Sequence, residues 1–316
     1  MKAVVLGTDD RFRLTATADE PLPGPGEVAV RVAYAGVQWG DVLVRDGHFP
    51  VPRPFVPGFE AAGRIVAVGD GVDGGRIGEQ VLALVTGGAY AEVVLAPAAL
   101  AVPAPDVDAR TAAGFGWTAP TAHDLIHTVT RLGPGESVLI HAASGAVGTL
   151  AAQFAAAAGA RRIVGVAGSA GRADYARRFG FHEVLTRDRF PEALGDETFD
   201  VILDPVGGAT RSANLALLAP HGRLAVYGNI ASFAPVAVSA NDLLMNGQSL
   251  LTYNSSLLSR TDPARLAAGA ARALALVADG SVLIDITAEH GLADVESAIA
   301  DLASGATAGK SIVRVQ

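Results

Sequence analysis

The chain has 316 residues, 50% of them hydrophobic, and a formal net charge of −8 at pH 7. This length is enough for two domains. The negative net charge and the lack of basic clusters argue against nucleic acid as the main partner. It contains no cysteine, which excludes disulfides and thiolate metal sites, so redox chemistry needs a bound cofactor. No apolar run is long enough to cross a membrane and the first residues lack a signal-peptide core, so we expect a cytoplasmic protein.

Short strands dominate residues 1–120. Each is bounded by glycine, proline or aspartate, as in an all-β segment that is partly rolled, and we place them at Lys2–Leu6, Val28–Ala35, Ala62–Val68, Gln80–Val85 and Ala89–Leu95. One short helix is expected at Trp39–Arg45, and the proline-rich run from His48 to Gly58 predicts an extended, stiff loop. Thr118–Thr130 is expected to form the helix that leads into a second domain.

The stretch from Glu136 to Ala160 has the pattern of the first half of a βαβ unit. Val138–Ile140 is typical of a buried parallel strand, small residues follow it, and an alanine-rich segment of high helix propensity comes next. The spacing Ala142-x-x-Gly145-x-x-Gly148 is the dinucleotide fingerprint with alanine in its first position. Because it follows a strand and opens a helix, it predicts a pyrophosphate site at the helix N-terminus. The expected contacts are Ser144, Gly145, Ala146, Val147 and Gly148.

The residues that follow the next strand indicate which dinucleotide binds. About twenty residues after the fingerprint, a NAD-binding protein would carry a carboxylate for the ribose hydroxyls. This chain has Gly168, Ser169 and Arg172 there instead. A carboxylate would repel a 2′-phosphate, whereas a hydroxyl and a guanidinium would bind it, so we expect NADP(H). Arg187, after a strand expected at Glu183–Thr186, is either a contact of the phosphate or adenine, or a solvated charge.

Strands and helices alternate up to about residue 280, which predicts a parallel doubly wound sheet. The elements expected after Thr186 are Phe199–Leu203, Ala209–Leu218, Arg223–Val226, Asn241–Asn246, Ser249–Tyr253 and Pro263–Ala278. The last residues, with Val282–Thr287, a helix at Leu292–Ala303 and a strand at Ser311–Val315, are expected to rejoin the first domain. The predicted division is a catalytic domain of residues 1–122 and 281–316 and a cofactor domain of residues 123–280.

Five local motifs follow one another along the chain: Ala35–Asp41 (AGVQWGD), Pro57–Gly63 (PGFEAAG), His141–Gly148 (HAASGAVG), Asp204–Gly208 (DPVGG) and Gly309–Ser311 (GKS). In this order they resemble the medium-chain dehydrogenase/reductase superfamily, in its zinc-independent quinone oxidoreductase (zeta-crystallin-like) branch. The resemblance covers essentially the whole chain. It implies an α/β fold with a GroES-like β-rich catalytic domain and a Rossmann domain, NADPH as cofactor, and 1,4-reduction of quinones or α,β-unsaturated carbonyls.

The resemblance also implies which side chains form the site. The family has an asparagine where Gln38 stands and tyrosines where Leu43 and Phe49 stand; Gln38 keeps an amide, whereas Phe49 keeps the ring without the phenolic proton. His48 is either a substitute proton donor or a solvated loop histidine. Asp41 is expected to anchor backbone N–H groups. The expected cofactor contacts beyond the fingerprint are Thr121, Val206, Tyr227 (or else a core residue at a strand end), Asn229 and Lys310.

No metal site is predicted. Phe59 stands where the zinc-dependent members of the superfamily have a histidine, and Glu60 alone does not hold zinc, since catalytic zinc takes three protein ligands. His123 and His127 have an i, i+4 spacing that is typical of metal ligands, but the sequence offers no third ligand. A hydrogen-bonded helix is the interpretation that we favour for this pair.

The sequence therefore predicts an NADPH-dependent, metal-independent reductase of quinones or activated C=C bonds. A conjugated acceptor needs orientation and hydrogen-bond donors near its carbonyl oxygen, whereas an alcohol without a Lewis acid is poorly activated for hydride loss. Two alternatives stay open: an enoyl reductase for one biosynthetic intermediate, free or carrier-bound, and a non-catalytic NADPH-binding protein. The apolar edge strand expected at Ser249–Tyr253 favours a homodimer, because an unprotected edge pairs with a second copy.

Overall fold

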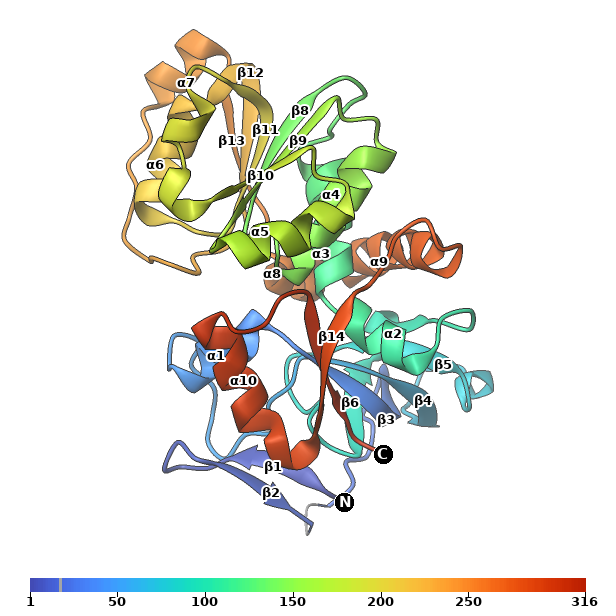
Figure 1. Ribbon diagram of the computed structural model, residues 1–316. Helices are drawn as coiled ribbons and strands as arrows, with labels where there is room; N and C mark the ends of the chain where they lie inside the picture. Colours follow the sequence, from blue (N-terminus) through green and yellow to red (C-terminus); the bar gives the residue numbers. More distant parts are fainter. Residues whose placement is uncertain (17–18) are drawn as a thin grey trace. The chain divides into compact units, whose positions relative to one another are not determined.

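Two sheets of different kinds organise the chain in the computed structural model, which describes residues 1–16 and 19–316 (Figure 1). A mainly antiparallel sheet lies in a first unit, formed by Met1–Pro120 and Ser255–Gln316, and a parallel sheet lies in a second unit, formed by Thr121–Asn254. The two kinds of sheet are those that the alternation of elements along the sequence predicted.

Among the described residues, the first unit contains a seven-stranded sheet in the order β14-β15-β3-β4-β5-β7, with β6 paired to β3. Only the β14–β15 pair is parallel. A separate two-stranded sheet pairs β1 with β2. The strands are β1 (Ala3–Leu6), β2 (Phe12–Thr15), β3 (Glu27–Val37), β4 (Glu60–Val68), β5 (Gln80–Leu84), β6 (Val93–Pro97), β7 (Ala101–Pro103), β14 (Ile286–Gly291) and β15 (Lys310–Arg314). The helices are α1 (Trp39–Arg45), α2 (Ala109–Phe115), α8 (Ser255–Thr261), α9 (Pro263–Ala278) and α10 (Val295–Ser304).

The core of the first unit follows the two periodicities of its elements. Val28, Val30 and Val32 alternate along β3 and are fully buried, as expected for one face of a strand. Val295 and Ile299 repeat at helical spacing on α10 and join the same cluster. Apolar burial of this kind stabilises a fold by roughly 25 cal/mol for each Å² removed from water.

Most of the predicted elements lie where the sequence placed them, α1 and α9 among them. The strand predicted at Ala89–Leu95 is wrong at its start, because β6 begins only at Val93. The N–H groups of Ala89 and Tyr90 donate instead to the carbonyl oxygens of Gly58 and Pro57, so these residues are held by a loop rather than by a neighbouring strand. No local pattern predicted β2 or the three residues of β7.

The division into two units also differs from the predicted domains. The first unit resumes at Ser255, so residues 255–280, which we had assigned to the cofactor domain, belong to it. The physical reason is the buried stripe of α9, which includes Leu266, Ala270 and Leu274 and packs against β7 and the 3₁₀ turn Ala98–Leu100. An amphipathic helix reveals in its sequence that one face is buried, but not against which sheet.

The second unit is a six-stranded parallel sheet in the order β10-β9-β8-β11-β12-β13. The strands are β8 (Ser137–His141), β9 (Arg162–Ala167), β10 (Glu183–Thr186), β11 (Phe199–Asp204), β12 (Leu218–Val226) and β13 (Ser249–Thr252). The helices are α4 (Ala146–Ala157), α5 (Ala170–Ala176), α6 (Gly208–Ala216) and α7 (Ala240–Asn246), and α3 (Thr118–Asp124) leads into the unit. The order reverses between β8 and β11, as in a dinucleotide-binding Rossmann sheet, whose ligands bind at the carboxyl ends of the strands.

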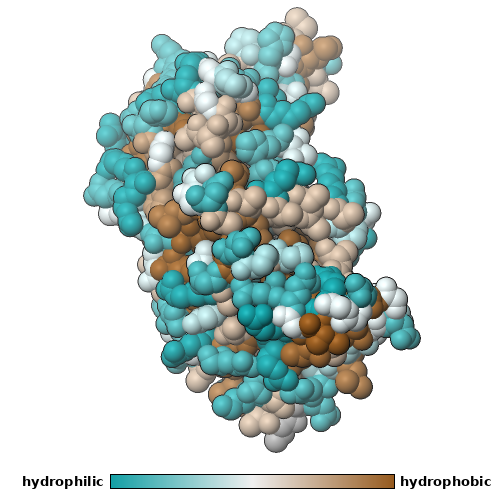
Figure 2. Space-filling model, turned by 90° about the vertical axis from the view of Figure 1, so that its right-hand side faces the viewer, coloured by the Kyte–Doolittle hydropathy of each residue, from teal (hydrophilic) through white to brown (hydrophobic). Residues whose placement is uncertain are grey.

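One face of the molecule is mostly polar. On the face drawn in Figure 2, hydrophilic residues cover most of the area and hydrophobic residues gather in separate patches. Within residues 1–16 and 19–316, no helix has the length and hydrophobicity needed to cross a bilayer.

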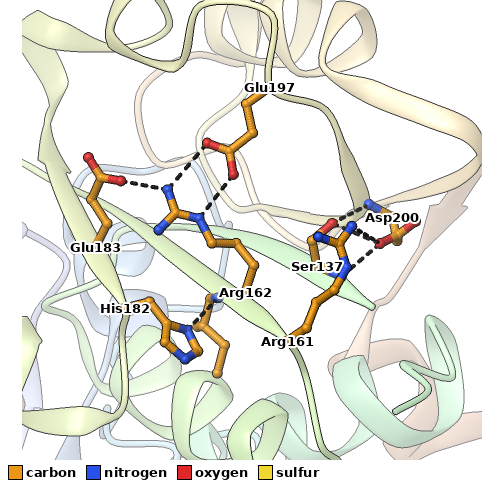
Figure 3. Close-up of polar contacts among 8 residues, drawn as sticks. Ser137, Arg161, Arg162, His182, Glu183, Glu197 and Asp200 are labelled. Atoms are coloured by element: carbon orange, nitrogen blue, oxygen red, sulfur yellow. Dashed lines mark hydrogen bonds and ion pairs between the residues drawn. The ribbon is translucent and has the colours of Figure 1, made fainter. Parts of the chain in front are cut away.

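Charged residues tie the amino ends of the parallel strands together (Figure 3). At the start of β9, Arg162 donates to Glu183 of β10 at 2.6 Å and to Glu197, just before β11, at 3.0 Å. The N–H and hydroxyl of Ser137 on β8 donate to the Asp200 carboxylate at 2.7 and 2.8 Å. These contacts lie at the end of the sheet opposite to the fingerprint, so they fix the strands without occupying the ligand-binding edge.

This network predicts a measurable loss of stability. Arg162→Met should lower the free energy of unfolding by about 1 kcal/mol, because Arg162 joins two partly exposed carboxylates and exposed pairs contribute little individually. Arg161→Met is the matched control, since its side chain is 63% exposed and, among the described residues, its one ion pair is with Asp200, at 3.6 Å; its effect should stay below about 0.5 kcal/mol. Urea unfolding of both variants tests this. An equal loss from both would show that Arg162 has no special role.

Candidate functional site

The turn between β8 and α4 carries the dinucleotide fingerprint at the carboxyl end of β8. Ala142 has a φ of +52°, in the left-handed region, which costs an alanine roughly 1–2 kcal/mol. Its carbonyl oxygen accepts the N–H of Gly145, the N-cap of α4, at 2.9 Å. The turn is therefore tight, and it leaves the first N–H groups of α4 without partners inside the helix, which suits a pyrophosphate.

Gly148 is required by the close packing of helix and turn. A Cβ at this position would lie 2.4 Å from the Ala142 carbonyl oxygen and 2.9 Å from Ala143 Cα. Only glycine fits there, which is the role of the third small residue of the fingerprint. Ser144, in the same turn, is 3% exposed.

Two arginines meet at the end of β9. A Cβ on Gly168 would lie 3.3 Å from Arg187 Nη2 and 3.8 Å from Arg172 Cδ, so the two side chains converge over this glycine. Arg172 Nη1 also lies 3.5 Å from the hydroxyl of Ser144. Burial, followed by the like charge of Arg187, lowers the pKa of Arg172. Two guanidinium groups held together beside the fingerprint form a site that favours a phosphate.

Ser169 follows Gly168 in the sequence. It is the N-cap of α5 with an extended backbone, and its side chain makes no capping hydrogen bond. The predicted 2′-phosphate contacts Gly168, Ser169 and Arg172 therefore lie at the start of α5, and Arg187 directly follows the neighbouring β10. Their contact with a phosphate stays a prediction.

Asp204 connects the loops that follow β11 and β12. It is fully buried, and it accepts the N–H groups of Val206 and Gly207 at 2.6 and 3.1 Å. Arg211 donates to the same carboxylate at 2.9 Å and to the Gly228 carbonyl oxygen at 2.8 Å. The predicted contact Val206 is thereby held next to the loop of residues 227–229.

The other predicted contacts of the second unit lie on the same loops or on α3. A Cβ on Gly207 would lie 3.1 Å from Asn229 Oδ1, so the Asn229 amide is adjacent to the loop after β11. Burial, and then the negative charge of Asp204, raises the pKa of Tyr227, which keeps its hydroxyl protonated. Thr121 is 8% exposed on α3. The roles of these three residues toward a cofactor stay predictions.

In the first unit, Gln38 is the N-cap of α1. A Cβ on Gly40 would lie 3.4 Å from the Gln38 Nε2 and 3.5 Å from Phe59 Cδ2, so the amide and the Phe59 ring are neighbours. Phe49, 42% exposed, packs its ring edge against Phe59 with centroids 6.4 Å apart. The structure thus brings together an amide and two aromatic rings, with the exposed His48 next in sequence.

A buried ion pair joins β4 and β15, the strands on either side of β3, and sequence reasoning missed it. The Lys310 ammonium binds the Glu60 carboxylate, with side-chain exposures of 3% and 0%. The other oxygen of Glu60 accepts the Trp117 N–H. Each strand begins with its charged residue and carries a second charge, Arg64 or Arg314, so the strand sequences gave no specific signal for this pair. The cofactor contact expected of Lys310 stays a prediction.

The predicted helix around His123 and His127 is present, with a π-helical turn at Leu125–Val129. The two imidazole rings lie 4.6 Å apart and both pack against Phe154. Asp124 accepts the Tyr253 hydroxyl at 2.9 Å. Within the residues that the structure describes, no three histidines, cysteines or carboxylates are grouped in a way that could hold a metal.

Comparison with known proteins agrees with this geometry. The family model of zinc-binding dehydrogenases matches residues 146–269, and that of the alcohol dehydrogenase GroES-like domain matches residues 24–106. The quinone oxidoreductase of Pseudomonas aeruginosa is 33% identical over 303 residues, which cover 92% of each chain. The chain belongs to the medium-chain dehydrogenase/reductase superfamily, in its zinc-independent quinone oxidoreductase branch.

Two further relatives extend the comparison within this superfamily. The 2-haloacrylate reductase of a Burkholderia species is 34% identical over 246 residues, 73% of each chain. The structure of Escherichia coli quinone oxidoreductase complexed with NADPH has a TM-score of 0.89 and 26% identity, and the match covers 100% of both chains. The family resemblance and the fold class predicted from the sequence, a GroES-like domain plus a Rossmann domain, are confirmed.

The buried ion pair gives a prediction for this medium-chain reductase fold. Lys310→Met should lower the free energy of unfolding by about 3–5 kcal/mol, because it leaves the Glu60 carboxylate buried without a partner. The double variant Lys310→Met/Glu60→Gln should recover much of that loss. Lys2→Met, which changes the other lysine of the chain at an exposed position, is the control. Chemical unfolding decides the outcome, and a double variant no more stable than Lys310→Met would contradict the assignment.

Proposed function

We propose that the protein is an NADPH-dependent reductase that transfers hydride to quinones or α,β-unsaturated carbonyls by 1,4-addition. The observation that carries the proposal is the ion pair of Glu60, the carboxylate beside the position where zinc-dependent members have a histidine. The Lys310 ammonium inside the first unit already neutralises this carboxylate. Next to Glu60 in the sequence stands Phe59, whose ring neighbours the Gln38 amide. This group of residues offers two aromatic rings at nearly right angles and one amide, which suits an acceptor activated by its own conjugation.

The residues expected to contact the acceptor, called the acceptor-side residues, are Gln38, His48, Phe49 and Phe59. They have separate tasks in this proposal. The rings of Phe49 and Phe59 stack on or against a planar acceptor. The Gln38 amide N–H donates to the acceptor oxygen on which negative charge develops during reduction, and such a preorganised donor lowers the barrier. The proton that completes the reaction comes from His48 or from water; His48, exposed in the loop before Phe49, is open to solvent exchange.

NADP(H) is the cofactor, and the residues of the second unit fit it. The tight turn at Gly148 and the N-terminus of α4 accommodate a pyrophosphate. Arg172 and Arg187, converging over Gly168, favour a 2′-phosphate. When bound, NADPH supplies the hydride. The protein's residues supply binding and orientation.

The arginine pair predicts cofactor preference. Arg172→Ala should weaken NADPH binding about tenfold, because a charge-assisted hydrogen bond to a partly exposed phosphate contributes roughly 1.5 kcal/mol. NADH lacks the phosphate, so its affinity should hardly change. Titrations of both cofactors, followed by the fluorescence of the reduced nicotinamide, measure these affinities.

Arg178→Ala is the matched control for this experiment. Arg178 follows Arg172 along the same part of the chain. Its guanidinium carbon lies over the rings of Tyr175 and Phe179, 5.3 and 5.4 Å from their centroids. Its removal should leave both affinities unchanged. A wild-type preference for NADH, or equal weakening of both cofactors in Arg172→Ala, would show that this loop does not bind the 2′-phosphate.

The reaction itself is tested by turnover. After treatment with a metal chelator, the protein should still reduce a small quinone or a cyclic enone with NADPH. With NADP⁺ it should not oxidise simple alcohols. Appreciable alcohol oxidation, or activity that is lost on chelation and restored by Zn²⁺, would contradict the proposal. Reduction of a carrier-tethered enone but of no small acceptor would favour the enoyl reductase alternative, and NADPH binding without any turnover would favour a non-catalytic role.

We further propose that the protein forms a homodimer through β13. This strand is the edge of the parallel sheet, and its Leu250 is 36% exposed. Leu244 and Met245 on the preceding α7 are 76% and 81% exposed, which extends the apolar surface. A free apolar edge is protected when a second copy pairs with it.

Leu250→Arg should convert the dimer into a monomer, because a charge on the paired edge opposes its burial. Light scattering coupled to gel filtration gives the mass. Ile77→Arg, at a position 55% exposed in the first unit, is the control and should stay dimeric. A wild-type monomer, or a dimer that survives Leu250→Arg, would rule out this edge as the interface.

A further inference from the structure

A single buried carboxylate joins the segments that carry the acceptor-side residues. Asp41 lies on α1 and is 1% exposed. Its Oδ2 accepts the Gln38 N–H and the Tyr90 hydroxyl, both at 2.9 Å, and its Oδ1 accepts the Gly58 N–H at 3.2 Å. The sequence-based expectation that Asp41 anchors backbone N–H groups is therefore confirmed.

These hydrogen bonds set the place of two groups that face the acceptor in the proposed reaction. The Asp41 N–H returns a bond to the Gln38 carbonyl oxygen at 3.0 Å, so the N-cap residue is held from both sides. Gly58 has a φ of +91°, and a Cβ there would lie 2.8 Å from the Tyr90 N, so this segment is pressed against Tyr90. Phe59 follows directly. A change at Asp41 therefore moves the Gln38 amide and the Phe59 ring together.

We infer that Asp41 is a positioning residue of acceptor reduction: its carboxylate fixes the backbone of Gln38 and of Gly58, and through it keeps the Gln38 side-chain amide and the Phe59 ring in the arrangement that receives the acceptor. This inference rests on the proposed function. It goes beyond an anchoring role, because it ties the charge on Asp41 to the rate of reduction rather than to the fold or to cofactor binding.

The surroundings of Asp41 make its charge responsive to pH. Burial raises the pKa of Asp41 to about 7, against the lowering effect of the hydrogen bonds from Gln38 and Tyr90; Glu60 raises it further and Lys310 lowers it. On α1 itself, Arg45 and Asp46 pair with each other at 2.7 Å. The neighbouring α10 carries Glu296 and Asp301, which are exposed.

Protonation of Asp41 weakens its hold on the three donors, because the neutral carboxyl accepts hydrogen bonds less strongly than the carboxylate. Acceptor reduction should therefore rise as the pH rises through the pKa of Asp41, about 7. The stability effect has the opposite sign. Since the pKa in the folded state lies above that of an unfolded aspartate, the stability contributed by the neutral form is present below the ordinary aspartate pKa of 3.8 and is lost as the pH rises from there to about 7.

The first measurement is the pH profile of kcat/KM for a small quinone. Asp41→Asn should reduce kcat about tenfold, the loss expected for one hydrogen bond to a charged group, while the Kd for NADPH stays within about twofold. The inflection near neutral pH should disappear. Tyr90→Phe removes one donor that lowers the Asp41 pKa, so its inflection should move to higher pH; this variant also serves if Asp41→Asn fails to fold. Asp46→Asn, on the exposed end of the same helix, is the control and should keep the wild-type profile.

The second measurement needs no turnover. In ¹H–¹⁵N spectra of the wild type, the amide signals of Gln38 and Gly58 should shift with one common midpoint, and the midpoint should move in Tyr90→Phe. Wild-type turnover with an unchanged kcat and pH profile in Asp41→Asn, or amide signals that do not titrate together, would overturn this inference alone. A wild type that reduces no acceptor would overturn the proposed function and this inference with it, even if the amides titrate together.

Discussion

The ion pair between Lys310 and Glu60 is the interaction on which the first unit depends. Both groups are almost fully removed from water, and a buried charge without its partner costs several kcal/mol. The surrounding backbone is shaped to admit it: Cβ atoms at Gly36 and Gly116 would lie 2.1 and 1.9 Å from the Glu60 oxygens. Because Glu60 also accepts the Trp117 N–H, the pair fixes the turn from which α3 begins. The strands, the turn and the carboxylate of Asp41 are thus arranged around one neutralised charge.

In each unit a buried carboxylate holds the loops of the candidate site. In the second unit, Asp204 is buried and accepts two backbone N–H groups and a guanidinium. In the first unit, Asp41 is buried and accepts two backbone N–H groups and a phenol. A buried carboxylate can accept several donors at once, so it fixes a loop that has no regular secondary structure. The difference lies in the charge of the neighbour, since Arg211 pairs with Asp204 directly, whereas Asp41 is held by neutral donors.

Local sequence patterns predicted the elements well and the long-range contacts poorly. The bounds of α1, β10 and α9 agree with prediction; Asp46 and Gly47 follow α1, and α9 begins at Pro263 and is followed by Asp279 and Gly280. Arg172 was predicted to bind a phosphate, but its convergence with Arg187 depends on the pairing of β9 with β10, which no local pattern specifies. The Glu60–Lys310 pair joins residues 250 positions apart, and a single sequence gives no direct signal for a contact of that range. The attachment of α9 to the first unit was missed for the same reason.

The sequence separation of this ion pair also orders the assembly of the chain. The second unit is one continuous segment, whereas the first unit is built from two segments on either side of it. Contacts between distant residues are formed slowly, because the entropy of closing the loop between them is lost before the contact stabilises anything. The ion pair of Glu60 therefore forms only when the strand that carries Lys310 is present. The parallel sheet, in contrast, can form from its own continuous segment. During synthesis, the acceptor-side residues reach their final arrangement only after the cofactor-binding sheet has been made.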